Sequence, residues 1–286
     1  MMPAEADGGA VPRDAGPFRF LRGRHGLFAA PVGDSVIAAC IARTGGFAEG
    51  QVRVLSALAQ PGATVVDVGA NIGTVAMPLA RRVGPQGRVI AFEPMRVPFL
   101  CLCAGAALNG LAQIEPRQQA VGEAAGEQPL PDFDPAAPGN HGAISLRGAV
   151  GTQRVPRITI DSLALEHLAL LKIDAEGMDW QVLRGARETI RRCRPAIYLE
   201  AGADRAARAQ GIGALQAEGY DWFWQFAFFV DPSTLADAQK NPFPNTGDVN
   251  LLALPPGHPA RHNLAPVSAP DADWREDFAA HRRGIA

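Results

Sequence analysis

The sequence predicts an α/β fold whose central sheet is mostly parallel. Along one continuous stretch, residues 64–199, short apolar runs alternate with segments of helical period, and the first strand-to-helix corner is rich in glycine. Strands that alternate with helices in this way are joined by right-handed crossovers and pair in parallel. The 286 residues are 47% hydrophobic and 20% charged, a composition typical of a globular chain that buries a full core.

Five strands are expected in this stretch, because each is a short apolar run bounded by turn residues. They cover residues 64–68, 87–92, 114–121, 168–173 and 195–199. Helices are expected where apolar residues recur at every third or fourth position. They cover 49–58, which precedes the first strand, and then 72–83, 97–108 and 178–190.

The two ends of the chain do not follow this alternation. Residues 1–17 are predicted to be disordered, and residues 18–41 to form short strands. The tail from Pro255 onward carries many prolines and is predicted to be extended or disordered. The expected organisation is an N-terminal extension, a main domain and a C-terminal tail, which cover 1–45, 46–255 and 256–286.

Two long segments inside the main domain also lack a regular period. Residues 122–160 are predicted to form a loop that ends in a short β excursion, and residues 232–250 a second irregular loop. Long loops inside a compact domain are usually functional. In an open α/β sheet such loops would border the ligand crevice at the carboxyl ends of the strands.

Charge and cysteine content exclude several classes of protein. The formal net charge of −2, from 27 basic and 29 acidic residues, gives no general attraction to nucleic acid. The longest nearly apolar run, 222–230, is far shorter than the about 20 residues that span a membrane. Neither the four cysteines nor the histidines have metal-ligand spacing, so no metal site is expected. Reduced cysteines and the lack of a signal peptide predict a cytoplasmic protein.

The first candidate site is the segment 67–73 (DVGANIG), where the first strand meets a helix. Glycine allows positive φ and lets a ligand approach the main chain closely. The helix start near Ile72 offers free N–H groups and a positive dipole end, which suit a carboxylate or a phosphate. This segment is therefore predicted to bind an anionic group of a nucleoside ligand.

Glu93 ends the second strand and is the second candidate. It follows Gly73 by about 20 residues, the spacing at which nucleoside-binding βαβ units place an acid on the ribose. The dinucleotide fingerprint would need glycines at positions 69, 71 and 74, but Asn71 and Thr74 occupy the last two. Asp67 would also bring negative charge toward a pyrophosphate. S-adenosylmethionine avoids both conflicts, because it has a ribose, a carboxylate and two cationic groups.

Asp174 and Glu176 follow the fourth strand and form the third candidate. They lie at the edge of the sheet where ligands bind, and either carboxylate could serve as the base of a transfer reaction. The alternative is structural, with Asp174 capping a helix and Glu176 in its first turn. His141 is a further candidate base, because the ordinary pKa of histidine suits proton removal near pH 7. A wall position for His141 is the alternative.

Several motifs resemble those of the FkbM-type S-adenosylmethionine-dependent methyltransferases. The resemblance covers residues 46 to 255 and rests on eight segments: GFAEGQ (46–51), PGATVVDVGANIGTVAMPLA (61–80), GRVIAFEP (87–94), LNGL (108–111), QAVGE (119–123), VPRITIDSL (155–163), LLKIDAEGMDWQVLRGARETI (170–190) and RPAIYLEAG (194–202). It implies the class I methyltransferase fold, which is Rossmann-like and has a seven-stranded, mostly parallel sheet with helices on both faces. A reversed last strand is part of that fold, so strands are implied near 222–228 and 250–254.

The resemblance also implies site residues and an activity. The implied donor contacts are Asp67, Gly69, Ala70, Asn71, Gly73 and Glu93, with Ala120 near the adenine. Asn140, Asn241, Asn245 and Asn250 are candidate contacts of the acceptor, although asparagines also build turns. The implied activity is O-methylation of a hydroxyl on a sugar, a glycolipid or a secondary metabolite. A non-catalytic scaffold subunit and an NAD-dependent dehydrogenase are the alternatives, and the N-terminal extension could pair two copies in a homodimer.

Overall fold

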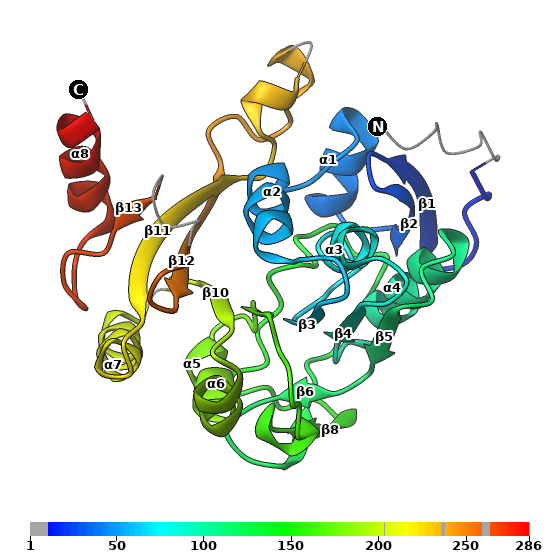
Figure 1. Cartoon of the computed structure of the whole chain (residues 1–286). Coiled ribbons are helices and arrows are strands. Elements are labelled where there is room, and N and C mark those ends of the chain that lie inside the picture. The colour runs from blue at the N-terminus through cyan, green and yellow to red at the C-terminus, as the bar shows by residue number, and fades with distance from the viewer. Residues whose placement is uncertain (1–10, 203, 236–237, 259–263, 286) are drawn as a thin grey trace.

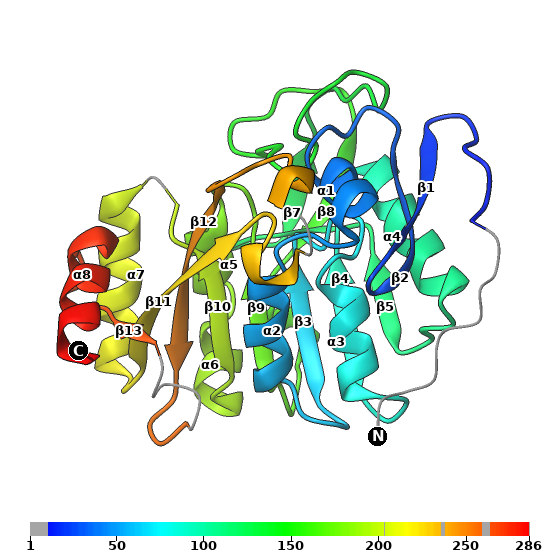
Figure 2. The ribbon, with the colours of Figure 1, turned by 90° about the horizontal axis from the view of Figure 1, so that it is seen from above.

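A twisted eight-stranded sheet runs through the centre of the computed structural model, which describes residues 11–202, 204–235, 238–258 and 264–285 (Figure 1). Figure 2 shows the strands side by side. From one edge to the other they are β5 (Ile114–Arg117), β4 (Arg88–Phe92), β3 (Thr64–Val68), β9 (Leu170–Ile173), β10 (Ala196–Glu200), β12 (Gly247–Leu254), β11 (Asp221–Phe228) and β13 (Ala265–Pro266).

The strand directions confirm the topology that the resemblance implies. Strands β5, β4, β3, β9 and β10 are parallel, whereas β12 is antiparallel to both of its neighbours, β10 and β11. Strand β12 is therefore the reversed last strand of a seven-stranded class I sheet. The short strand β13 extends this sheet by pairing antiparallel with the outer edge of β11.

Helices cover both faces of the sheet, because successive residues of each strand point to opposite sides. Val65 belongs to a core on one side and Val66 to a core on the other. The first core packs against α1 (Ile37–Thr44), α2 (Glu49–Leu58), α3 (Ala76–Val83) and α4 (Arg96–Leu108). The second core packs against α5 (Asp179–Arg184), α6 (Arg187–Cys193) and α7 (Arg205–Ala217) (Figure 1).

Two smaller sheets lie beside the main one. The N-terminal extension forms a hairpin of β1 (Phe18–Gly23) and β2 (Gly26–Pro31), which packs against α4. The excursion expected in the first long loop is present as a three-stranded sheet of β6 (Ala120–Val121), β8 (Arg154–Ile158) and β7 (Gly126–Pro129), and the 3₁₀ turn η1 (Asp161–Leu163) follows it.

The C-terminal tail corrects the prediction of an extended or disordered segment. Its residues 274–285 form helix α8 (Trp274–Ile285), because the prolines end at residue 270 and the side chains of Trp274 and Phe278, one turn apart, pack against the second core. The other loop predicted as irregular contains the 3₁₀ turns η2 (Pro232–Thr234) and η3 (Ala238–Lys240) before β12 begins. Across the described residues, no helix combines the length and the apolar character needed to cross a membrane.

Several predicted boundaries were also wrong. Residues 37–44 form a helix rather than a continuation of the N-terminal strands, and the second helix of the main domain begins at Ala76 rather than Ile72. The segment expected as one helix over 178–190 is divided at Gly185 into α5 and α6. Gly185 lies directly against the carbonyl of Gly122, so the chain bends there to admit the neighbouring backbone. The predicted disorder at residues 1–10 lies outside the described residues.

Asp277 fastens helix α8 to the sheet. Its Oδ2 accepts hydrogen bonds from Trp224 Nε1 at 2.7 Å and from Ser268 N at 3.0 Å, and the residue is buried. Asp277→Ala leaves the buried Trp224 Nε1 and the partly buried Ser268 N without an acceptor, so we expect the free energy of unfolding to fall by about 2 kcal/mol in urea denaturation. The exposed neighbour Glu276→Ala is the control, with an expected loss below about 1 kcal/mol. Equal losses for the two variants would contradict this role.

Candidate active site

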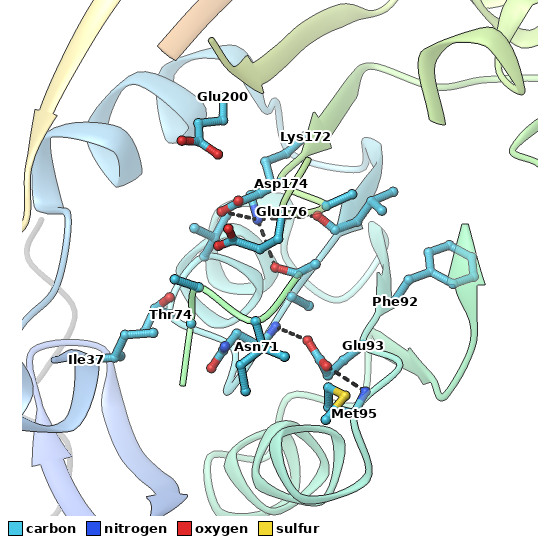
Figure 3. Close-up of a pocket in the computed structure, with 18 of the residues that line it drawn as sticks. Ile37, Asn71, Thr74, Phe92, Glu93, Met95, Lys172, Asp174, Glu176 and Glu200 are labelled. Atoms are coloured by element: carbon cyan, nitrogen blue, oxygen red, sulfur yellow. Dashed lines mark hydrogen bonds and ion pairs between the residues drawn. The ribbon is translucent and has the colours of Figure 1, made fainter. Parts of the chain in front are cut away.

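A pocket opens at the carboxyl edge of the sheet, where β3, β4, β9 and β10 end (Figure 3). Its wall also contains part of the first long loop, the start of β12 and residues of the N-terminal helices α1 and α2. This is the position at which open α/β sheets bind ligands. The predicted site residues in the wall are Gly69, Ala70, Asn71, Glu93, Ala120, Asn140, His141, Asp174, Glu176 and Asn250.

The turn after β3 is shaped by backbone contacts with both neighbouring strands. Gly69 N and Ala70 N both donate to Phe92 O, at 3.0 and 2.9 Å. Gly69 has a φ of +73°, and a Cβ atom there would lie 1.8 Å from Asp174 O, so only glycine fits. Asn71 also has a positive φ, and its Oδ1 accepts a hydrogen bond from Ile72 N at 2.7 Å. The turn therefore holds the ends of β3, β4 and β9 together.

Glu93 lies at the end of β4 and contacts this turn directly. Its Oε2 accepts from Asn71 N at 2.9 Å and its Oε1 from Met95 N at 2.8 Å (Figure 3). Burial raises the pKa of Glu93 to about 7, although the two backbone N–H groups lower it. Each carboxylate oxygen retains a lone pair for a ligand hydroxyl.

The Lys172 ammonium links β9 to the neighbouring strand β3, beneath the turn that follows β3. Its Nζ lies 3.1 Å from Asp67 Oδ1 and 3.4 Å from Asp174 Oδ2, and it donates to Gly69 O at 3.0 Å. The Lys172 and Asp67 side chains are buried. Burial opposes the charge of Lys172, but the carboxylates of Asp67 and Asp174 raise its pKa above the ordinary value. Lys172 is thus a buried cation held by two acids.

This pair changes the interpretation of two predicted donor contacts. Asp67 faces Lys172 inside the protein and is not part of the pocket wall, and neither is Gly73, whose Cα packs near Leu102. Both residues therefore shape the turn from behind. Sequence reasoning did not select Lys172, although a lysine inside an otherwise apolar strand is a signal that a buried acid faces it.

The loop after β9 presents Asp174 and Glu176 to the pocket. Asp179 organises this loop, because its carboxylate accepts from Ala175 N at 2.9 Å and from Gly177 N at 3.2 Å. Asp174 precedes the start of α5 by five residues, so the alternative interpretation of Asp174 as a helix cap is wrong. Glu176 has a φ of +46°, which is uncommon for a residue other than glycine.

Acidic side chains from the ends of β9 and β10 lie close together here. Burial and the neighbouring carboxylate of Asp174 raise the pKa of Glu176 to about 9 and that of Glu200 to about 7. Figure 3 shows Asp174 and Glu176 close to Lys172, with Glu200 nearby. Within the part of the chain that the structure describes, no three His, Cys, Asp or Glu side chains are grouped so as to hold a metal ion.

His141 lies in the pocket wall with its ring nearly buried. Its Nε2 lies 2.9 Å from Ala137 O, so this nitrogen carries the proton that it donates to the carbonyl. The ring packs edge-on against Phe133, with the centroids 4.9 Å apart. The structure therefore agrees with a wall position, while a catalytic role for His141 stays a prediction.

The four asparagines predicted to contact the acceptor separate into two pairs. Asn140 and Asn250 lie in the pocket wall. Asn241 and Asn245, both among the described residues, lie outside it and build turns instead. Asn241 Oδ1 accepts from Phe243 N at 2.8 Å, and Asn245 has a φ of +58°. Asparagine stabilises turns in both of these ways, and a contact of Asn241 and Asn245 with the acceptor stays a prediction.

Apolar side chains line two other parts of the wall. Beside Glu93, a small apolar cluster contributes Met95, Ala120, Leu146 and Met178. The rings of Phe47 and Phe229 also line the pocket, and their centroids lie 5.2 Å apart. The pocket wall therefore combines an apolar slot next to Glu93 with a pair of aromatic rings.

The sequence of the chain is similar to those of known methyltransferases. Residues 67–228, more than half of the chain, match the family described as the methyltransferase FkbM domain. Over 191 residues the chain is 28% identical to the methyltransferase sdnD of Sordaria araneosa, which covers 55% of this chain and 73% of that protein.

Solved structures with the same type of fold show low sequence identity to this chain. The crystal structure of methyltransferase FkbM from Methylobacillus flagellatus KT gives a TM-score of 0.45 at 17% identity, covering 68% of this chain. The match spans only 44% of that chain, less than half of its length. Fibrillarin from Aeropyrum pernix, solved with S-adenosyl-L-methionine, gives a TM-score of 0.43 at 11% identity and covers 87% of this chain and 85% of its own.

The buried ion pair makes a testable contribution to stability. Lys172→Met leaves Asp67 charged and unpaired in the interior, so we expect the free energy of unfolding to fall by about 3–5 kcal/mol in chemical denaturation. Asp67→Asn in the Lys172→Met background should recover part of this loss. Lys240→Met removes the other lysine of the chain, which is exposed, and serves as the control. A loss below about 1 kcal/mol for Lys172→Met would refute the assignment.

Proposed function

This chain belongs to the FkbM family of methyltransferases, and from that membership we propose that it transfers a methyl group from S-adenosylmethionine to a hydroxyl of a sugar, a glycolipid or a secondary metabolite. The observation that carries the donor assignment is the contact between Glu93 and the turn after β3. It brings a buried carboxylate and a glycine turn together at neighbouring strand ends. This is the arrangement that binds the ribose of a nucleoside.

The rest of the wall fits the other parts of this donor. The apolar slot formed by Met95, Ala120, Leu146 and Met178 lies next to Glu93 and suits an adenine ring beside the ribose. The donor also carries a sulfonium and an ammonium group. Asp174 and Glu200 supply negative charge to the wall, and its lysine, Lys172, is already paired with Asp67. A cationic donor is therefore favoured over one with a pyrophosphate.

The acceptor side supports an enzyme rather than a non-catalytic scaffold subunit. The first long loop contributes residues 140–144 to the same wall as the donor residues, and strand β12 contributes Asp248 and Asn250. An acceptor held between this loop and β12 would be shielded from water next to the donor. Alignment and exclusion of water are the main contributions that a methyltransferase has to make.

Beyond binding the two substrates, the chain has to orient the acceptor hydroxyl and accept its proton. When bound, S-adenosylmethionine supplies a methyl group already activated by the positive sulfur. Asn140 and Asn250 can orient the acceptor hydroxyl by hydrogen bonds, and a carboxylate at the end of β9 can accept its proton. Asp174 and Glu176 are the two carboxylates in that position.

The ribose assignment predicts the effect of removing Glu93. Glu93→Ala should weaken the binding of S-adenosylhomocysteine at least tenfold, about 1.4 kcal/mol, in calorimetric titration. Glu93→Gln keeps one carbonyl oxygen and should lose less affinity. Glu123→Ala changes an exposed acid and should bind as the unaltered chain does. Unchanged affinity in Glu93→Ala would exclude a ribose contact at this carboxylate.

The same contact predicts a pH dependence. A ribose hydroxyl donates to the ionised carboxylate, and the pKa of Glu93 is about 7 in the free protein. Affinity for S-adenosylhomocysteine should therefore be lost as the pH falls through 7, and be about tenfold weaker at pH 6 than at pH 8. Glu93→Gln should remove this dependence. A profile that is flat in the unaltered chain would show that the charge of Glu93 does not contribute to binding.

A further inference from the structure

Glu176 differs from Asp174 and Glu93, two other acids of the pocket wall, in having a carboxyl group without a partner in the described part of the chain, a property that it shares with Glu200 and Asp248. Among the described residues, none donates a hydrogen bond to its carboxylate or forms an ion pair with it, although its backbone is firmly held. Asp174 lies 3.4 Å from the Lys172 ammonium, and both oxygens of Glu93 accept backbone N–H groups. A carboxylate held by a cation is a weaker base than a free one.

The loop around Glu176 is built to present this side chain. The carboxylate of Asp179 accepts hydrogen bonds from the backbone N–H groups of Ala175 and Gly177, the residues on either side of Glu176. Ser145 Oγ donates to Glu176 O at 2.5 Å, which ties the first long loop to the same backbone. These contacts hold Glu176 in a left-handed conformation with a φ of +46°, and strain of this kind is maintained mainly at functional sites.

The charges that face Glu176 are almost all negative. Asp174 and Asp179 lie on its own loop, Glu200 ends β10, and Asp248 lies on β12. The nearest cation, Lys172, is engaged by Asp67 and Asp174. In the free protein these carboxylates favour the protonated form of Glu176, in agreement with its raised pKa of about 9. A positive charge entering the pocket would favour the ionised form.

We propose that Glu176 is the catalytic base of the transfer, and that its ionisation follows the charge on the sulfur of the donor. This assignment rests on the proposed function. Glu176 loses its proton when the sulfonium donor binds, and the resulting carboxylate accepts the proton of the acceptor hydroxyl. The freed electron pair on the oxygen forms the new O–CH₃ bond, while the electrons of the broken C–S bond stay on sulfur. One negative and one positive charge disappear together.

The proposal can be tested without knowing the acceptor. S-adenosylmethionine and S-adenosylhomocysteine differ by the methyl group and the positive charge, so their binding can be compared by calorimetry at pH 7.0. Titrations in phosphate and in Tris, whose ionisation enthalpies differ, give the number of protons released. We expect the sulfonium ligand to release about one proton more than the neutral one.

Variants identify the group that releases this proton. In Glu176→Gln, which preserves the size of the side chain, the difference between the two ligands should disappear. Glu200→Gln removes a neighbouring carboxylate and should keep more than about half of the difference. Glu166→Gln changes an exposed acid before β9 and should keep all of it. Any titration of the ligands themselves is common to all four proteins and cancels in the comparison.

The possible results distinguish a failure of the donor assignment from a failure of the assignment of Glu176 as the base. If neither ligand binds the unaltered chain, the donor assignment fails, and this inference fails with it. If both bind and release equal numbers of protons, or if Glu176→Gln retains the difference, the donor assignment stands and Glu176 is not the coupled base. If Glu176→Gln binds neither ligand, Glu176 is a contact of the donor itself, which also overturns the proposal.

Discussion

The buried ion pair between Lys172 and Asp67 is the interaction on which the geometry of the pocket depends. The two residues are register partners on β9 and β3, so the charge lies between the two central strands of the sheet. The same ammonium donates to Gly69 O and lies near Asp174, which positions the turn after β3 and the loop after β9 together. A buried ion pair adds little to stability on its own, but it fixes which groups can meet.

The ion pair also determines the charge of the pocket. Because the Lys172 ammonium is paired with Asp67 and Asp174, Glu93, Glu176 and Glu200 form no ion pair with it or with any other cation among the described residues. Burial of several carboxylates close together raises their pKa values, so the free pocket retains protons that a cationic ligand can displace. The proposed donor and the proposed base are therefore linked by the same electrostatic feature. An anionic acceptor would be opposed by it.

The central strands could be predicted from the sequence, because strands buried on both faces are short continuous apolar runs. Glu93 and the glycine turn could also be found, since their spacing along the chain reflects one βα unit. The partners of the buried charges could not. Lys172 and Asp67 are far apart in sequence, and Asp179 acts through backbone N–H groups that have no sequence signal. Helix α8 was missed because its apolar face has only two large side chains and follows a proline-rich segment.

The N-terminal extension lies next to the pocket as well as next to the sheet. Gly33 N donates to Pro135 O and Ser35 N to Gly139 O, so the first long loop is fastened to the segment that leads into α1. Ile37 of α1 then lines the pocket close to the backbone of this loop. A change in the extension would therefore move this part of the pocket wall, while Glu93 and its turn are held by the sheet.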